Sequence, residues 1–106
     1  MRVLLDHCCP MGLRNHLPQH EVTTAYFLGW QALKNGELLN AAESSGFEVF
    51  LTADQSIRYQ QNLAARNIAI VLLVPQDWPI VKKHLQEISA LVAECKPRDF
   101  HVMRMM

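Results

Sequence analysis

The stretch IAIVLLV, residues 68–74, decides the fold class of this chain. It is an unbroken apolar run, rich in β-branched side chains, and Pro75 follows it at once. Such a run is typical of a strand that is covered on both faces, as strands are in parallel sheets that carry helices on both sides. The stretch therefore predicts a buried, central strand of an α/β domain.

The segments on either side of this run alternate between strand and helix patterns. Further strands are predicted at residues 3–5, 21–24 and 47–51, and the tail, residues 96–106, is predicted to add a last strand or to be partly disordered. Helical patterns occupy residues 10–17, 36–46 and 56–66 and a long stripe that ends at Cys95. This order predicts one domain, residues 1–106, folded as a three-layer α/β/α sandwich around a mostly parallel sheet with right-handed crossovers.

Composition and charge restrict the partners of the chain. Its 106 residues are 50% hydrophobic, and ten Lys plus Arg balance ten Asp plus Glu, so the formal net charge is zero. A neutral protein offers no overall field to nucleic acid, and a polyanion must therefore bind to a local patch. The odd number of cysteines, three, fits a reducing compartment. No apolar stretch reaches the roughly 18 residues that span a bilayer. We expect a cytoplasmic protein without membrane contact.

Two of the predicted strands end on a carboxylate. Asp6 follows residues 3–5 directly, and Asp54 closes the segment LTAD after the third strand. The carboxyl ends of parallel strands meet at one edge of a sheet, where ligands of open α/β folds bind. Glu37, at the start of the next helix pattern, is placed to reach the same edge. Grouped carboxylates suit Mg²⁺ or Mn²⁺, and such a cation supports phosphodiester hydrolysis.

Each of these acids also has a structural interpretation. Asp6 and Asp54 can accept hydrogen bonds from backbone amides as turn or N-cap residues, a role that does not exclude metal binding. A glutamate in the first helical turn, such as Glu37, is favoured by the helix dipole alone. The sequence leaves both interpretations open.

Five short segments carry a resemblance to a known family: RVLLD (2–6), LGW (28–30), KNGELL (34–39), LTAD (51–54) and RYQQNL (58–63). In order and spacing, over residues 1 to about 92, the chain resembles the PIN-like domain family of small prokaryotic proteins, related to PIN-domain ribonucleases and toxin nucleases. The resemblance implies a PIN-like fold and cleavage of single-stranded RNA with Mg²⁺ or Mn²⁺ held by Asp6, Glu37 and Asp54. It also implies a toxin that pairs with an antitoxin.

The chain departs from the family pattern at two places. His7 and Cys8 stand where many members have a glutamate and an asparagine, and Gln55, Ser56 and Ile57 follow Asp54 without the second acid that is often found there. Three acids remain where four are common. The alternative function is therefore a catalytically impaired PIN-like scaffold that binds a protein, either an antitoxin or a second copy of the chain.

A receiver-like phosphoacceptor domain is a third hypothesis, because it too has acids at the ends of its first and third strands. Three features speak against it. Asp6 lacks an acidic neighbour, no Ser or Thr follows residues 68–74, and Lys96 follows a helix pattern instead of a strand.

The remaining candidates are cysteines, aromatic residues and basic residues. Adjacent cysteines lack the spacing of a zinc site, so we expect Cys8 or Cys9 to pack as a small apolar residue and His7 to border the site. An aromatic cluster at residues 26–30 is expected to pack against the core, although stacking on bases is the alternative. Solvated surface charges are the simplest interpretation of the basic residues, and those that could contact substrate phosphates are Arg14, Lys34 and Arg58.

Overall fold

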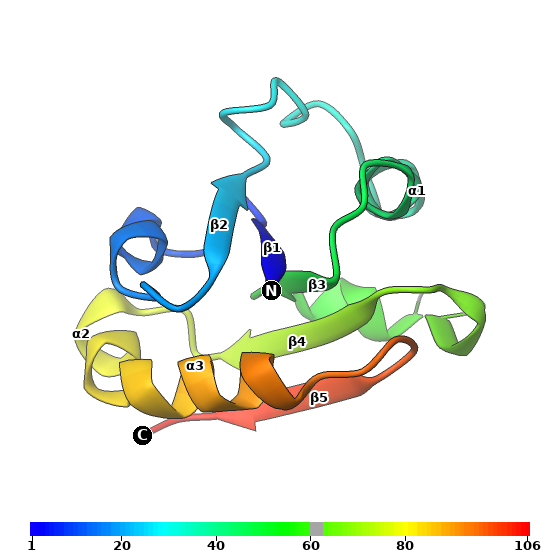
Figure 1. The fold of residues 1–106 in the computed structure, drawn as a ribbon. Helices are drawn as coiled ribbons and strands as arrows, with labels where there is room; N and C mark the ends of the chain where they lie inside the picture. Colours follow the sequence, from blue (N-terminus) through cyan, green and yellow to red (C-terminus); the bar gives the residue numbers. More distant parts are fainter. Residues whose placement is uncertain (60–62) are drawn as a thin grey trace.

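The computed structural model describes residues 1–59 and 63–106 and contains a five-stranded sheet (Figure 1). The strand order is β2-β1-β3-β4-β5, and each neighbouring pair is parallel. The mostly parallel α/β sheet predicted from the sequence is thus confirmed. The strands are β1 (Arg2–Leu5), β2 (Glu21–Thr24), β3 (Val49–Thr52), β4 (Ala69–Val74) and β5 (Phe100–Arg104).

Helical segments connect each strand to the next. The α-helices are α1 (Asn35–Ser44), α2 (Trp78–Val81) and α3 (Leu85–Glu94), and the 3₁₀ helices are η1 (Met11–Asn15), η2 (Gln55–Tyr59), η3 (Leu63–Ala65) and η4 (Lys82–His84). The part of the chain that the structure describes contains no helix with the length and apolar character needed to cross a membrane.

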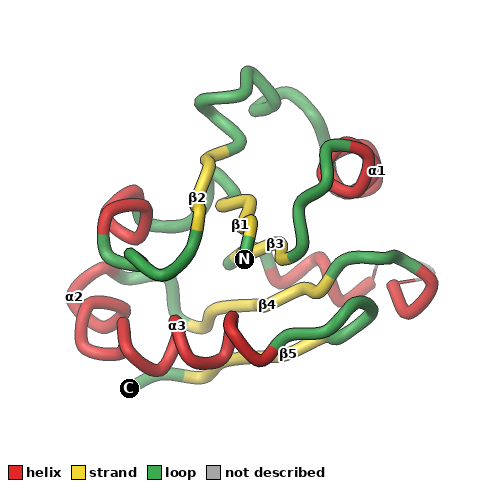
Figure 2. Tube along the Cα trace, viewed as in Figure 1, coloured by secondary structure: helices red, strands yellow, loops and turns green. Residues whose placement is uncertain are grey.

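Both faces of the sheet are covered by helices, which gives three layers (Figure 2). Alternate residues of a strand point to opposite faces. Leu5 and Leu51 pack on the face that η1, α2 and α3 cover, whereas Leu4 and Phe50 pack on the face of α1 and η2. The inner strands β1, β3 and β4 are buried on both faces, which explains why residues 68–74 have no polar position, whereas the edge strands β2 and β5 are largely exposed or partly buried.

The connections leave β1 and β3 toward opposite faces of the sheet. From β1 the chain passes through η1 to β2 on one side, and from β3 it passes through η2 to β4 on the other. The strand order therefore reverses between β1 and β3. In open α/β sheets a crevice forms at this point, beyond the carboxyl ends of the two strands.

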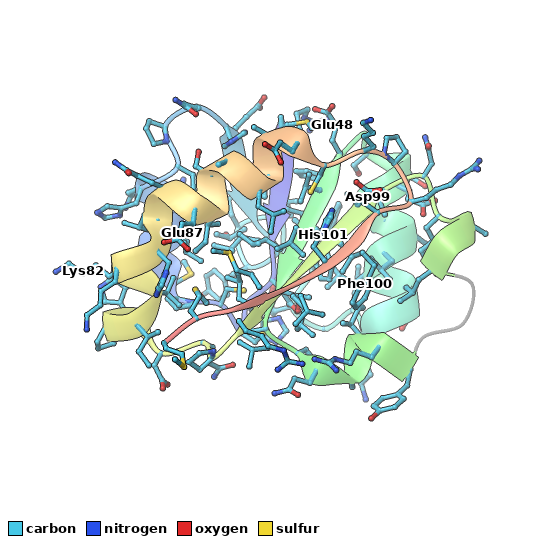
Figure 3. All side chains as sticks on the ribbon, turned by 90° about the horizontal axis from the view of Figure 1, so that it is seen from below. Glu48, Lys82, Glu87, Asp99, Phe100 and His101 are labelled. Carbon is cyan, nitrogen blue, oxygen red and sulfur yellow. The ribbon has the colours of Figure 1, made fainter. Side chains whose placement is uncertain are left out.

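The last connection has the opposite hand from the other three. It runs from β4 to β5 in the same direction along the sheet as the step from β3 to β4, but α3 packs on the face of η1. The four connections therefore cannot all be right-handed, and the prediction of right-handed crossovers does not hold for the whole sheet. Figure 3 shows β5 along the sheet edge beside α3, with Phe100 and His101 on the strand.

Several predicted helices are shorter or interrupted. Residues 10–17 form only the 3₁₀ helix η1. The helix predicted at residues 56–66 is replaced in its described part by η2 and η3, and its residues 60–62 lie outside the described residues. The long stripe before Cys95 is divided by η4. The stripe still faces the core, because Val81, Ile88 and Val92 are all buried.

The run 68–74, predicted to be the central strand, forms the inner strand β4, and β3 occupies the centre of the sheet.

Candidate functional site

A cleft of about 640 Å³ lies beyond the carboxyl ends of β1 and β3, at the reversal of strand order. Residues that follow three strands form its floor, and the loop before α1 together with the first turns of that helix forms its wall. Both strand-end acids, Asp6 and Asp54, belong to this lining. The lining residues are Asp6, His7, Cys8, Gln31, Ala32, Leu33, Lys34, Leu38, Ala53, Asp54, Gln55 and Gln76.

Asp6 is held in a closed group of hydrogen bonds and is only 6% exposed. Its Oδ1 accepts the backbone N–H of His7 at 2.8 Å and lies 3.1 Å from Nδ1 of the same residue. Its Oδ2 accepts the Thr52 hydroxyl at 2.8 Å and the Cys8 thiol at 3.4 Å. The carboxylate is therefore oriented by donors on both of its oxygens, which is the arrangement that a buried acid requires.

Thr52 connects the two acids, and sequence reasoning did not identify it. Its hydroxyl donates to Oδ2 of Asp6 and accepts the backbone N–H of Asp54 at 3.1 Å. The side chain is fully buried at the end of β3. The feature of the sequence that could have identified Thr52 is a hydroxyl side chain at the end of an otherwise apolar strand. A buried polar atom needs a hydrogen-bond partner, and the partners of this hydroxyl are the Asp6 carboxylate and the Asp54 backbone N–H.

Asp54 is more open than Asp6. It is half-buried, and its Oδ1 accepts the backbone N–H of Ser56 at 3.0 Å, at the start of η2. This is the capping role that the sequence left open, and it occurs at the floor of the same cleft. The structure therefore brings Asp6 and Asp54 to one cavity, as their positions at strand ends indicate.

Glu37 takes a different position. It lies exposed in the first turn of α1 and does not belong to the cleft lining, to which Lys34, just before the helix, and Leu38 of the helix contribute. Within residues 1–59 and 63–106, no group of three His, Cys, Asp or Glu side chains is arranged to hold a metal ion. Mg²⁺, however, is commonly bound through one or two carboxylates, several waters and a substrate phosphate. Asp6 and Asp54 supply carboxylate oxygens of this kind at one cleft.

The three basic residues considered for phosphate contacts lie in different parts of the structure. Lys34 lines the cleft. Arg14 lies over the ring of Phe27, with its guanidinium carbon 5.7 Å from the ring centroid. Arg58 borders a smaller cavity of about 280 Å³ beside Arg98 and β5. Of the three, only Lys34 is placed to neutralise a phosphate in the cleft.

The adjacent cysteines have distinct environments, and both thiols are free. Cys8 lies in the cleft, where its sulfur accepts the Ala53 N–H at 3.4 Å. A hydrogen bond from Cys9 lowers the pKa of the Cys8 thiol, assisted by Ala53 and Thr52 and opposed by burial and by the charge of Asp6. Cys9 is buried in the core, and its hydrogen bond to Cys8 together with burial raises its pKa well above the ordinary value. Cys9 is thus the small packing residue, as predicted for one of the two cysteines, and His7 lines the cleft.

The aromatic cluster is divided between core and surface. Trp30 packs edge-to-face on Phe47, with ring centroids 6.2 Å apart. Tyr26 and Phe27 instead are 64% and 69% exposed. The packing prediction is correct for Trp30 and wrong for the other two. The reason is a tight turn after β2 that directs consecutive side chains outward, which residue spacing alone does not reveal.

No family model, curated protein or solved structure matches this chain. A functional assignment therefore depends on the cleft, its two carboxylates and the neighbouring side chains.

Proposed function

We propose that this chain is a metal-dependent ribonuclease of the PIN-like type that cleaves single-stranded RNA. The observation that supports the proposal most is the position of Asp6 and Asp54 at the ends of two adjacent parallel strands, on one cleft with Lys34. Two carboxylates and one amine at a strand-order reversal form a site of the charge and shape that a phosphodiester and a divalent cation require.

Asp6 and Asp54 would hold Mg²⁺ or Mn²⁺, with Glu37 of α1 as the candidate third acid. When bound, such a cation makes a coordinated water more acidic and polarises a phosphodiester oxygen. Thr52 keeps the Asp6 carboxylate oriented toward the cleft through its 2.8 Å hydrogen bond. Lys34 would balance the charge of a substrate phosphate at the cleft wall.

The test is cleavage of fluorescently labelled single-stranded RNA with Mn²⁺, by the wild type and by Asp54→Asn. Loss of an outer-shell partner commonly costs about 10- to 100-fold in metal affinity or activity, so loss of a ligand should lower the rate by at least that factor. Glu94→Gln is the matched control, because Glu94 is an exposed acid at the end of α3 and lies outside the cleft lining. Absence of cleavage by the wild type, or equal loss in Glu94→Gln, would contradict the proposal.

A second candidate is a PIN-like scaffold without catalysis that binds an antitoxin or a second copy of the chain. It is favoured by the hydrogen bonds of Asp6, since each of its oxygens already accepts two donors or close partners. Calorimetric titration with Mn²⁺ separates the two functions. Binding that is lost in both Asp6→Asn and Asp54→Asn supports the enzyme, whereas no heat of binding in any of the three proteins supports the scaffold.

The receiver-like hypothesis is weakened by the position of Lys96. This lysine lies in the loop between α3 and β5, which precedes a parallel strand. It is therefore at the amino edge of the sheet, whereas Asp6 and Asp54 are at the carboxyl edge. A lysine at the opposite edge cannot contact a phosphoryl group on either acid.

A further inference from the structure

The loop that follows β2 exposes two adjacent aromatic rings. Tyr26 and Phe27 are 64% and 69% exposed, although large apolar side chains are usually covered in a domain that has a core. Figure 1 shows this loop rising beyond the carboxyl end of β2. Large exposed aromatic side chains on consecutive residues are candidates for a binding surface.

A network of backbone hydrogen bonds holds the turn that carries the rings. The buried Thr24 hydroxyl accepts the Phe27 N–H at 3.0 Å, and the Tyr26 carbonyl accepts the Gly29 N–H at 3.0 Å. Gly29 has a φ of +75°, which glycine adopts without strain. Trp30 closes the turn by donating its N–H to the Ala25 carbonyl at 2.9 Å. The rings are thus presented by a fixed backbone, and binding to them requires little further ordering.

A cation lies beside one of the two rings. Arg14 of η1 places its guanidinium 5.7 Å from the centroid of Phe27. The same loop continues to Gln31, the first of its residues in the cleft lining. From Phe27 to Gln31 an extended chain spans at most about 14 Å. One short ligand can therefore touch the rings and the cleft together.

We propose that Tyr26, Phe27 and Arg14 form a stacking platform for unpaired bases of a single-stranded RNA whose backbone continues into the cleft. This inference deepens the proposed function, on which the identity of the ligand rests. Aromatic faces bind bases of any sequence, and an adjacent arginine attracts the phosphates. A protein partner would need a larger apolar area, whereas a strand of nucleic acid matches two rings with a cation beside them. Because the chain has no net charge, such a local patch is what an RNA requires.

The test is binding of a short labelled oligouridylate by fluorescence anisotropy in EDTA, so that neither metal nor cleavage affects the result. Phe27→Leu keeps an apolar side chain but removes the π face, and we expect about tenfold weaker binding. Phe100→Leu is the matched control, because Phe100 is a partly exposed phenylalanine on β5, at the opposite edge of the sheet, beside Arg58 and Arg98. It should bind as the wild type does, and the same RNA annealed to its complement should bind more weakly.

Several results would overturn the platform. The platform is contradicted if the wild type fails to bind the single strand, or if Phe27→Leu binds it as tightly as the wild type does. It is also contradicted if the wild type binds the duplex as tightly as the single strand. A loss of affinity confined to Phe100→Leu would place the RNA at the Arg58 cavity. Sedimentation of wild type and Phe27→Leu tests the remaining occupant. A dimer that only Phe27→Leu dissociates, with RNA binding unchanged, would assign the rings to a second copy. Cleavage by Asp54→Asn is measured separately, so the platform and the nuclease can fail independently.

Discussion

The carboxyl ends of β1 and β3 share a sequence pattern but differ in structure. Each is an apolar strand with an aspartate close behind it, and both acids reach the same cleft. Asp6 is buried with donors on both oxygens, whereas Asp54 is half-buried and caps η2 through one oxygen. Thr52 contributes to the difference, because its hydroxyl donates to the side chain of Asp6 but contacts Asp54 only by accepting the backbone N–H of that residue.

The difference indicates that the two acids have different roles. A carboxylate that is fixed on all sides is oriented in advance but must exchange a hydrogen bond before it takes up a new ligand. A carboxylate that remains half-open can accept a ligand without such an exchange. We therefore expect Asp6 to contribute more to folding stability and Asp54 to contribute more to the chemistry of the cleft.

The largest effect on stability is expected from Asp6→Ala. The substitution leaves the Thr52 hydroxyl, the Cys8 thiol and the His7 N–H without their acceptor. Buried donors that lose a charged partner are costly, so the free energy of unfolding should fall by about 3 kcal/mol. Urea unfolding followed by circular dichroism measures it. A loss below about 1 kcal/mol would show that the hydrogen bonds around Asp6 contribute little net stability.

An intermediate effect is expected from Thr52→Val. Valine keeps the shape and the β-branched side chain of the strand but removes the hydroxyl that donates to Asp6 and accepts from the Asp54 N–H. The expected loss is about 1–2 kcal/mol. Thr23→Val is the matched control, because Thr23 lies on the edge strand β2 and is only half-buried. Equal losses in the two variants would contradict the role given to Thr52.

The smallest effect on stability is expected from Asp54→Ala. It removes the cap of η2, in which Oδ1 accepts the Ser56 N–H at 3.0 Å. Loss of an N-cap of this kind costs about 1 kcal/mol or less. The variant should nevertheless lose RNA cleavage. If Asp54→Ala lowers the free energy of unfolding as much as Asp6→Ala does, the two acids contribute equally to stability, and the different roles given to them are wrong.

The sequence predicted the inner strands well because β1, β3 and β4 are covered on both faces. Residues 3–5 and 68–74 have no polar position, and only a strand with two covered faces has that property. The pairing of Asp6 with Asp54 could also be predicted, since parallel strands end at one edge. The break at η4 could not, because Val81 and Ile88 remain on one face whether or not the helix is continuous.

The remaining parts of the site depend on backbone geometry that residue types do not encode. Glu37 has the correct type and spacing, but α1 places it outside the cleft lining while Lys34 and Leu38 belong to it. Tyr26 and Phe27 are apolar and would be assigned to a core by composition alone. Their exposure follows from one turn that contains Gly29 at positive φ. After this turn a third ring, the half-buried Trp30, packs against Phe47.

The parallel sheet also determines how the protein can be attached to a surface or a label. Every strand starts at the edge away from the cleft, so a fusion or an immobilising group joined at Met1 emerges on the far side of the molecule. Met106 follows the end of β5 and lies at the same edge as the cleft. A tether at the first residue leaves the entrance of the cleft accessible, whereas a tether at the last residue crowds that edge.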